Sequence, residues 1–148
     1  GAIICPAVLT SVPLGINTAI AVAAHEIPQE VGDVAILLAS GYSRTRALVL
    51  TPTRELCVQV EESVRKYSRH ADVDVASVYG GVGYEPQERA LRDGVDIVVA
   101  TPGRLIDHLE RGNVSFDDLE VLVLDEADRM LDIGFAPQIN AIVKEIPA

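Results

Sequence analysis

Short apolar runs alternate with amphipathic stretches along most of the chain, from residue 47 onward. The apolar runs suit buried strands, and each precedes a stretch whose apolar residues recur at helical spacing, as Leu56, Val60 and Val64 do. Strand–helix units that repeat in this way favour a parallel sheet with right-handed connections. The predicted strands are 47–50, 73–79, 96–100 and 121–124, and the predicted helices are 54–68, 86–92, 104–111 and 137–146.

The residues at the helix ends agree with this alternation. Pro86 stands where a first-turn proline belongs, and Gly94 and Gly112 stand where glycines commonly end helices. We therefore expect an α/β fold, a three-layer sandwich with a sheet of about five parallel strands.

The first 46 residues follow a different pattern. Residues 2–9 predict a strand and the alanine-rich residues 18–24 predict a helix, whereas Pro28 and Gly32 interrupt the chain after them. Residues 34–39 then form a second apolar run, either helix or strand. We expect this part to add one more strand and helix to the same sheet, so that the whole chain forms a single domain.

Composition and charge narrow the range of functions. The chain has 148 residues, of which 49% are hydrophobic, and its net charge is −10. Such a charge argues against broad electrostatic capture of nucleic acid, although a few loop arginines can still form a local basic track. Two cysteines far apart in the sequence are consistent with a reduced cytoplasmic setting or a soluble recombinant protein.

An uncharged run at residues 1–25 is long enough to span a membrane. Pro6, Pro13 and Gly15 interrupt this run, however, and no basic flank sets an orientation. We expect the run to be buried core, because a sheet removes apolar surface from water as lipid does. No membrane partner is expected.

Four short motifs each follow a predicted strand. They are Pro-Thr-Arg-Glu-Leu at 52–56, Gly-Gly at 80–81, Thr-Pro-Gly-Arg at 101–104 and Asp-Glu-Ala-Asp at 125–128. The carboxyl ends of parallel strands meet at one edge of the sheet, where open α/β folds bind ligands. Helix N-termini beside threonine hydroxyls and arginine guanidinium groups would form a phosphate-binding track there.

Together, the four motifs and residues 129–135 resemble the first RecA-like domain of DEAD-box RNA helicases, over about residues 46–148. The resemblance implies a RecA-like fold, as in P-loop NTPases. It also implies that the first three motifs grip the RNA backbone; otherwise their arginines would be surface residues at helix starts. The RNA-backbone residues that it nominates are Thr53, Arg54, Gly81, Thr101, Gly103 and Arg104.

The same resemblance assigns catalytic roles to the Asp-Glu-Ala-Asp carboxylates, with magnesium and ATP as cofactors. Asp125 would hold magnesium, usually through water, and Glu126 would orient the attacking water. Asp128 would contact a Ser-Ala-Thr motif, which the chain does not reach. Without the other three motifs, the same residues would equally fit a strand end with solvated acids.

The sequence departs from that family in its phosphate-binding part. No lysine precedes Lys66, and both the Gly-Lys-Thr loop and the glutamine-containing adenine motif are absent. The best positional candidate for a phosphate loop contains Gly15, Asn17 and Thr18, with Asn17 where lysine belongs. Without that lysine and the glycine N–H groups, the β- and γ-phosphates lose most of their binding energy. The second RecA-like domain, with its arginine fingers, is also absent from the chain. We therefore expect vestigial carboxylates, no ATP turnover and no bound cofactor.

Residues 9–47 resemble two consecutive transmembrane helices of ZIP zinc transporters, chiefly through the run His-Glu-Ile-Pro-Gln-Glu. The resemblance nominates His25, Glu26 and Glu30 as zinc ligands. The partner motif with its Asn and Asp ligands has no counterpart in residues 1–10, and a zinc site needs three or four convergent ligands. We therefore expect a polar helix face at a bend, and no bound zinc.

Residues 43–50 fit both families, so the two resemblances meet where their sequences coincide. This coincidence predicts an engineered or recombined chimera, in which residues 1–46 replace the first β–loop–α unit and residues 47–148 derive from a helicase. Three functions stay open: a helicase-like scaffold without turnover, a working fragment of an ATP-dependent RNA helicase, and a zinc-binding transporter fragment. We expect the scaffold, with at most weak RNA or magnesium binding and an open oligomeric state. His70 and His108 are expected at the surface.

Overall fold

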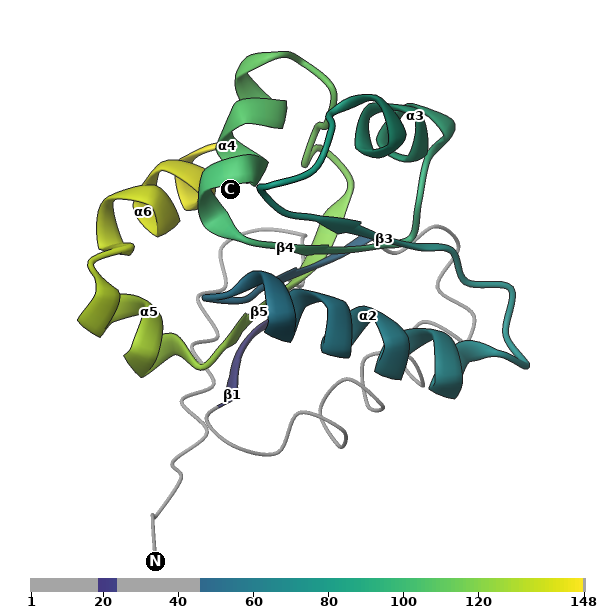
Figure 1. The fold of residues 1–148 in the computed structure, drawn as a ribbon, viewed down its shortest axis with the longest axis horizontal. Helices are drawn as coiled ribbons and strands as arrows, with labels where there is room; N and C mark the ends of the chain where they lie inside the picture. Colours follow the sequence, from purple (N-terminus) through teal and green to yellow (C-terminus); the bar gives the residue numbers. More distant parts are fainter. Residues whose placement is uncertain (1–18, 24–45, 148) are drawn as a thin grey trace, which may run out of the picture.

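The computed structural model describes residues 19–23 and 46–147, which form a parallel sheet covered by helices (Figure 1). From β2 to β5, strands and helices alternate as the hydrophobic pattern predicts. The strands are β1 (Ala19–Ala23), β2 (Arg46–Leu50), β3 (Val75–Val78), β4 (Ile97–Ala100) and β5 (Leu119–Asp125). The helices are α2 (Arg54–Ser68), α3 (Glu85–Asp93), α4 (Pro102–Glu110), α5 (Ala127–Ile133) and α6 (Ala136–Lys144).

The five strands of the described sheet run parallel in the order β1-β5-β2-β4-β3. Their register aligns the carboxyl ends: Leu50 pairs with Leu124 and with Ala100, and Ala100 pairs with Val78. The loops that follow these strands therefore emerge side by side at one edge. This arrangement confirms the predicted α/β sandwich and places the four motifs together.

Two aliphatic clusters pack on opposite faces of the sheet, because successive residues of a strand point to opposite sides. Ala47 and Val49 of β2 belong to the cluster that includes Val60 of α2. Leu48 and Leu50 belong to the other cluster, with residues of α3, α4, α5 and α6. Figure 1 accordingly shows α2 on one side of the sheet and α3, α4 and α6 on the other.

The predicted helix at 18–24 is wrong, because Ala19–Ala23 form the edge strand β1. Alanine favours helices locally, but a run this short does not decide between helix and strand. The β-branched Ile20 and Val22 suit a strand, and pairing with β5 satisfies backbone groups along that edge of the sheet. This part of the chain does contribute a strand to the sheet, but at 19–23; the strand predicted at 2–9 lies outside the described residues.

The short helix α5 was not predicted. It begins directly after Glu126, whose backbone is left-handed with φ 50° and ψ 49°, and it ends at Gly134 with φ 94°. The strand, the turn and the helix follow one another within a few residues. Neither the strand spacing nor the helix spacing of apolar residues therefore continues long enough to be recognised in the sequence. The helix places Met130, which is fully buried, in the same cluster as Leu48 and Leu50.

Within the described residues, no helix is long and apolar enough to cross a membrane. The predictions made for residues 2–9, 25–32 and 34–39 lie outside those residues.

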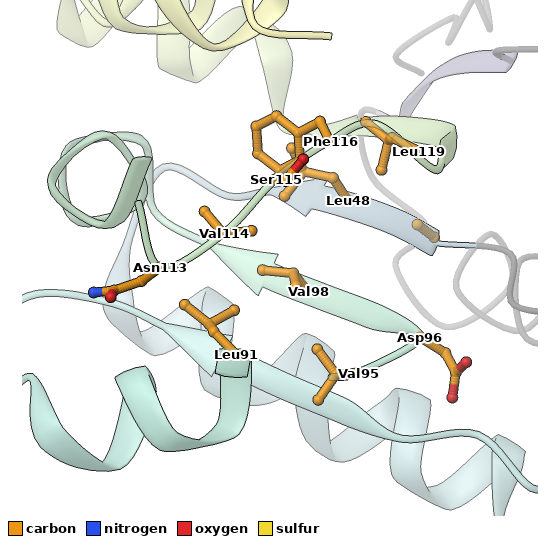
Figure 2. A pocket seen from close by; sticks show the side chains of 11 residues that line it. Leu48, Leu91, Val95, Asp96, Val98, Asn113, Val114, Ser115, Phe116 and Leu119 are labelled. Carbon is orange, nitrogen blue, oxygen red and sulfur yellow. The ribbon is translucent and has the colours of Figure 1, made fainter. Parts of the chain in front are cut away.

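A pocket with an empty volume of about 460 Å³, open solvent included, lies at the amino ends of β2, β4 and β5. Apolar side chains such as Leu91, Val98 and Phe116 line it, together with Asp96 (Figure 2). This is the edge of the sheet opposite to the four motifs. The motifs therefore do not share this pocket.

Candidate nucleic-acid interface

The first motif forms the beginning of α2. Thr53 is the N-cap residue in an extended conformation, and its hydroxyl oxygen accepts the N–H of Leu56 at 3.3 Å. The hydroxyl of Thr51, which is fully buried, donates to the carbonyl oxygens of Thr53 and Ala100, at 3.4 Å in both cases. These bonds fix the start of α2, and Arg54, its first residue, is exposed.

The second motif lies against the first. Gly81 has φ +84°, a conformation that suits glycine. A Cβ atom at Gly81 would lie 3.2 Å from Nη1 of Arg54, so the guanidinium group packs over this glycine. The Arg54 guanidinium carbon also lies 5.3 Å from the ring centroid of Tyr79. An exposed arginine is thus held next to an exposed glycine backbone.

The third motif joins the same surface from the other side. Thr101 donates its backbone N–H to Val78 O at 2.9 Å, and α4 begins at Pro102. Nη1 of Arg104 donates to Val82 O at 3.0 Å, which ties the start of α4 to the loop that contains the glycines. The side chain of Arg104 is only 10% exposed, whereas Gly103 is exposed.

The structure therefore brings all six nominated RNA-backbone residues to one continuous surface. We call this surface the arginine–glycine edge; it comprises residues 53–54, 80–83 and 101–104. The motifs and the resemblance they carry nominated six of its residues, whereas Val82 and Gly83 were not nominated. Sequence reasoning did not find the contacts that join these residues, since the contacts depend on side-chain packing between loops that are distant in sequence.

The Asp-Glu-Ala-Asp carboxylates lie at the same edge of the sheet, beyond β2. Asp125 is the last residue of β5 and is only 2% exposed, beside Ala23 of β1 in the register. Oε2 of Glu126 lies 3.1 Å from Nη1 of Arg129, and Asp128 is exposed in the first turn of α5. The three carboxylates thus occupy three different environments: buried, paired with a cation, and solvated.

These residues offer the hard oxygen donors that magnesium prefers. Magnesium is commonly held by one or two carboxylates together with waters and substrate phosphates, rather than by a complete protein cage. Asp125 and its neighbours fit such a site. In the described part of the chain, no group of three or more His, Cys, Asp or Glu residues could hold a metal by itself.

The described lysines do not lie at this edge. Lys66 is in the last turn of α2, a helix that begins at the carboxyl edge of the sheet and leads away from it. Lys144 is in the last turn of α6. The phosphate-loop candidates Gly15, Asn17 and Thr18 lie outside the described residues, as do the zinc candidates His25, Glu26 and Glu30. Their assignments stay predictions.

His108 is fully buried on α4, so the prediction of a surface position is wrong for this residue. Its Nε2 lies 3.1 Å from Oε1 of Gln87, and its Nδ1 lies 3.1 Å from Nδ2 of Asn113. An amide oxygen at Nε2 and an amide nitrogen at Nδ1 fit a neutral ring protonated on Nε2. The sequence contained a signal for this burial: His108 lies three residues after Leu105 and therefore on the same face of the helix, and Leu105 is also fully buried.

We expect acid to destabilise the fold through His108. Burial, and then the nearby Arg104, lower its pKa from 6.5 in the folded state. The unfolded chain therefore takes up the proton first, so this stabilising contribution is complete above pH 6.5 and is lost as the pH falls toward the folded pKa. The loss is at most about 1.4 kcal/mol per pH unit.

Urea unfolding at about pH 7.5 and about pH 5.5 measures this effect. His108→Gln should reduce the difference between the two free energies of unfolding, while His70→Gln, at an exposed position, should not. An equal pH dependence in both variants would contradict the role of His108.

Comparison with known proteins shows the family of the chain. Residues 20–148 match the DEAD/DEAH box helicase family model. The chain is 56% identical over 100 residues to DEAD-box ATP-dependent RNA helicase 14 of Arabidopsis thaliana, which covers 68% of this chain and 16% of that protein. It is 54% identical over 101 residues to ATP-dependent RNA helicase DeaD of Klebsiella pneumoniae, again covering 68% and 16%. The chain thus spans a small part of these relatives.

Solved structures agree with this match. A hypothetical ATP-dependent RNA helicase from Sulfolobus tokodaii has a TM-score of 0.74 and 38% identity, over 88% of this chain and 38% of that one. The yeast DEAD-box splicing factor Prp28 has a TM-score of 0.76 and 34% identity, over 84% and 32%. The fold is therefore RecA-like.

The family match begins inside the segment that we expected to be foreign. It starts at residue 20, near the beginning of β1, rather than at about residue 46. Nothing in the comparisons shows a zinc-transporter segment or a chimera. The parallel sheet, the order of the four motifs and the match over residues 20–148 together show that the chain belongs to the DEAD/DEAH box helicase family.

Proposed function

We propose that this chain works as part of an ATP-dependent RNA helicase and binds the backbone of single-stranded RNA along the arginine–glycine edge. The observation that carries the proposal is the continuity of this edge. Arg54 packs on Gly81, and Arg104 bonds to the same glycine-containing loop, so three separate motifs present one surface.

The chemistry of this edge suits phosphate groups. Exposed glycines allow a phosphate to approach the backbone N–H groups closely, and the starts of α2 and α4 add the positive ends of two helix dipoles. Guanidinium groups bind phosphate oxygens with charge-assisted hydrogen bonds. Since phosphates are the same at every nucleotide, we expect binding with little dependence on RNA sequence.

The carboxylates next to this edge would serve the nucleotide. Asp125 would hold magnesium through water, Glu126 would orient a water molecule, and Asp128 would make a hydrogen bond to a neighbouring motif. Magnesium bound there would neutralise charge on the phosphates. The contact with Arg129 restrains the Glu126 carboxylate at the beginning of α5.

A helicase-like scaffold without turnover is the second candidate function. It is favoured by the absence of a Gly-Lys-Thr loop and of any lysine before Lys66. A calorimetric titration with ATP and magnesium separates the two candidates. Binding at micromolar ATP that is lost in Asp125→Asn supports the nucleotide-dependent helicase, whereas no binding supports the scaffold.

The RNA proposal predicts that Arg54→Ala weakens binding of a fluorescein-labelled uridine decamer about tenfold, because a charge-assisted hydrogen bond to phosphate is lost. We also expect the slope of log affinity against log salt to fall by about 0.7, the value for one phosphate contact in single strands. Fluorescence anisotropy at several salt concentrations measures both quantities.

Arg92→Ala is the matched control. Arg92 is exposed in the last turn of α3, away from the edge, and its replacement removes the same charge. A similar loss of affinity in both variants would show that only net charge matters. No measurable binding by the unmodified chain would refute the proposed RNA contact.

A further inference from the structure

Tyr84 lies between two arginines at the start of α3. The guanidinium carbon of Arg104 lies 3.9 Å from the centroid of the tyrosine ring, and that of Arg111 also lies 3.9 Å from it. Cations over the face of an aromatic ring are attracted by its electron density. The ring therefore restrains Arg104, whose side chain has many rotatable bonds.

The hydroxyl group of Tyr84 adds a second restraint on the same arginine. It donates to Oδ2 of Asp107 at 2.9 Å, and this oxygen lies 3.9 Å from Nε of Arg104. Tyr84 thus holds the guanidinium by its ring and holds the counter-charge by its hydroxyl. Arg104 in turn donates to Val82 O at 3.0 Å.

The second arginine is anchored separately. Nη1 of Arg111 lies 3.4 Å from Oε1 of Glu88, which also accepts from Asn113 at 3.2 Å. The ring of Tyr84 is further packed edge-on against His108, with 5.5 Å between centroids. The tyrosine therefore cannot swing away from Arg104 without breaking contacts to Asp107 and His108 of α4 and to Arg111, which follows α4.

We propose that Tyr84 is a positioning residue for RNA binding: it holds Arg104, and through Arg104 the loop of residues 80–83, in the geometry that contacts the RNA backbone. This inference rests on the proposed function, because it concerns the same arginine–glycine edge. Tyr84 itself need not touch the RNA. Its effect is to reduce the conformational freedom that Arg104 and the loop would otherwise lose on binding.

The experiment compares Tyr84→Leu, Tyr84→Phe and Tyr84→Met with the unmodified chain. Tyr67→Leu serves as control, since Tyr67 is 49% exposed near the end of α2. The first measurement needs no RNA: proton–nitrogen spectra report the Nε–H resonances of Arg104 and Arg111, which the ring current of Tyr84 shifts. The second is the affinity for the fluorescein-labelled uridine decamer and its salt dependence.

We expect Tyr84→Leu and Tyr84→Met to move both arginine resonances and to weaken RNA binding about fivefold, the effect of losing one cation–π contact. Tyr84→Phe keeps the ring and should retain the resonances and most of the affinity, as should Tyr67→Leu. A lower salt slope in the Leu variant shows that a phosphate contact is lost, which a purely structural role would not produce. The unbranched, more flexible Met side chain provides a second variant without a ring if the Leu variant does not fold.

Unchanged arginine resonances in a folded Leu or Met variant would overturn the proposal, as would unchanged RNA affinity. An equal loss of affinity in Tyr84→Phe would overturn the role given to the ring, because the hydroxyl bond to Asp107 would then account for the whole effect. If the unmodified chain binds no RNA, the proposed function fails and the RNA role of Tyr84 fails with it. The arginine resonances distinguish this outcome from a failure of the Tyr84 contact itself, because they report the stacking of Tyr84 on the two arginines in the absence of RNA.

Discussion

Leu50→Ala should lower the free energy of unfolding by about 2–5 kcal/mol, as is usual when a large buried aliphatic side chain is cut back to alanine. Leu50 is fully buried at the end of the central strand β2. It belongs to the cluster in which the sheet meets α3, α4, α5 and α6, so a cavity there would be surrounded on several sides. Urea unfolding followed by circular dichroism measures the change.

Leu131→Ala makes the same chemical change at the surface. Leu131 is 58% exposed on α5, and we expect its replacement to change the free energy of unfolding by no more than about 0.5 kcal/mol. Similar losses in the two variants would mean that the packing around β2 is looser than the structure describes. A large difference would show that the cluster over this face stabilises the RecA-like fold.

Gly81→Val should have the largest effect at the arginine–glycine edge. A β-branched residue at φ +84° is strained, and holding it there costs about 1–3 kcal/mol. Its Cβ would also lie 3.2 Å from Nη1 of Arg54, so the guanidinium must move. We expect lower stability together with a loss of affinity for the uridine decamer of about tenfold or more.

Gly83→Val is its control within the same loop. A Cβ at Gly83 meets no atom within 4 Å, and its φ lies outside the left-handed region. This variant should keep the stability, and its affinity for the decamer should fall by less than that of Gly81→Val, because Arg54 is not displaced. Equal losses in both variants would indicate that the loop tolerates no side chain at all, and that the contact between Gly81 and Arg54 has no special importance.

The helicase family match changes the interpretation of the first part of the chain. An unusual sequence before residue 46 suggested replacement by a foreign segment, yet the family match extends back to residue 20 and β1 pairs with β5 in register. A strand at the edge of a sheet needs little beyond a short apolar run and free backbone partners. Divergent residues can therefore fill this position without loss of the fold.

Much of the site was predictable from motif order, because each motif follows a strand and parallel strands end at one edge. The environments of the charged groups were not predictable. Arg54 is exposed, whereas Arg104 stands at a similar place in its motif and is almost completely buried against Tyr84. Which arginine faces solvent depends on neighbours that come from other loops.

The sequence by itself determined the alternation of strands and helices after residue 46, since hydrophobic periodicity and helix-end residues act over short distances. It also determined the family, through four motifs in order. Only the tertiary structure decided that Ala19–Ala23 form a strand, because a short apolar run takes its conformation from the partner it pairs with. Likewise, only packing decided that Tyr84 lies between two arginines, since contacts between distant loops leave no periodic signal in the chain.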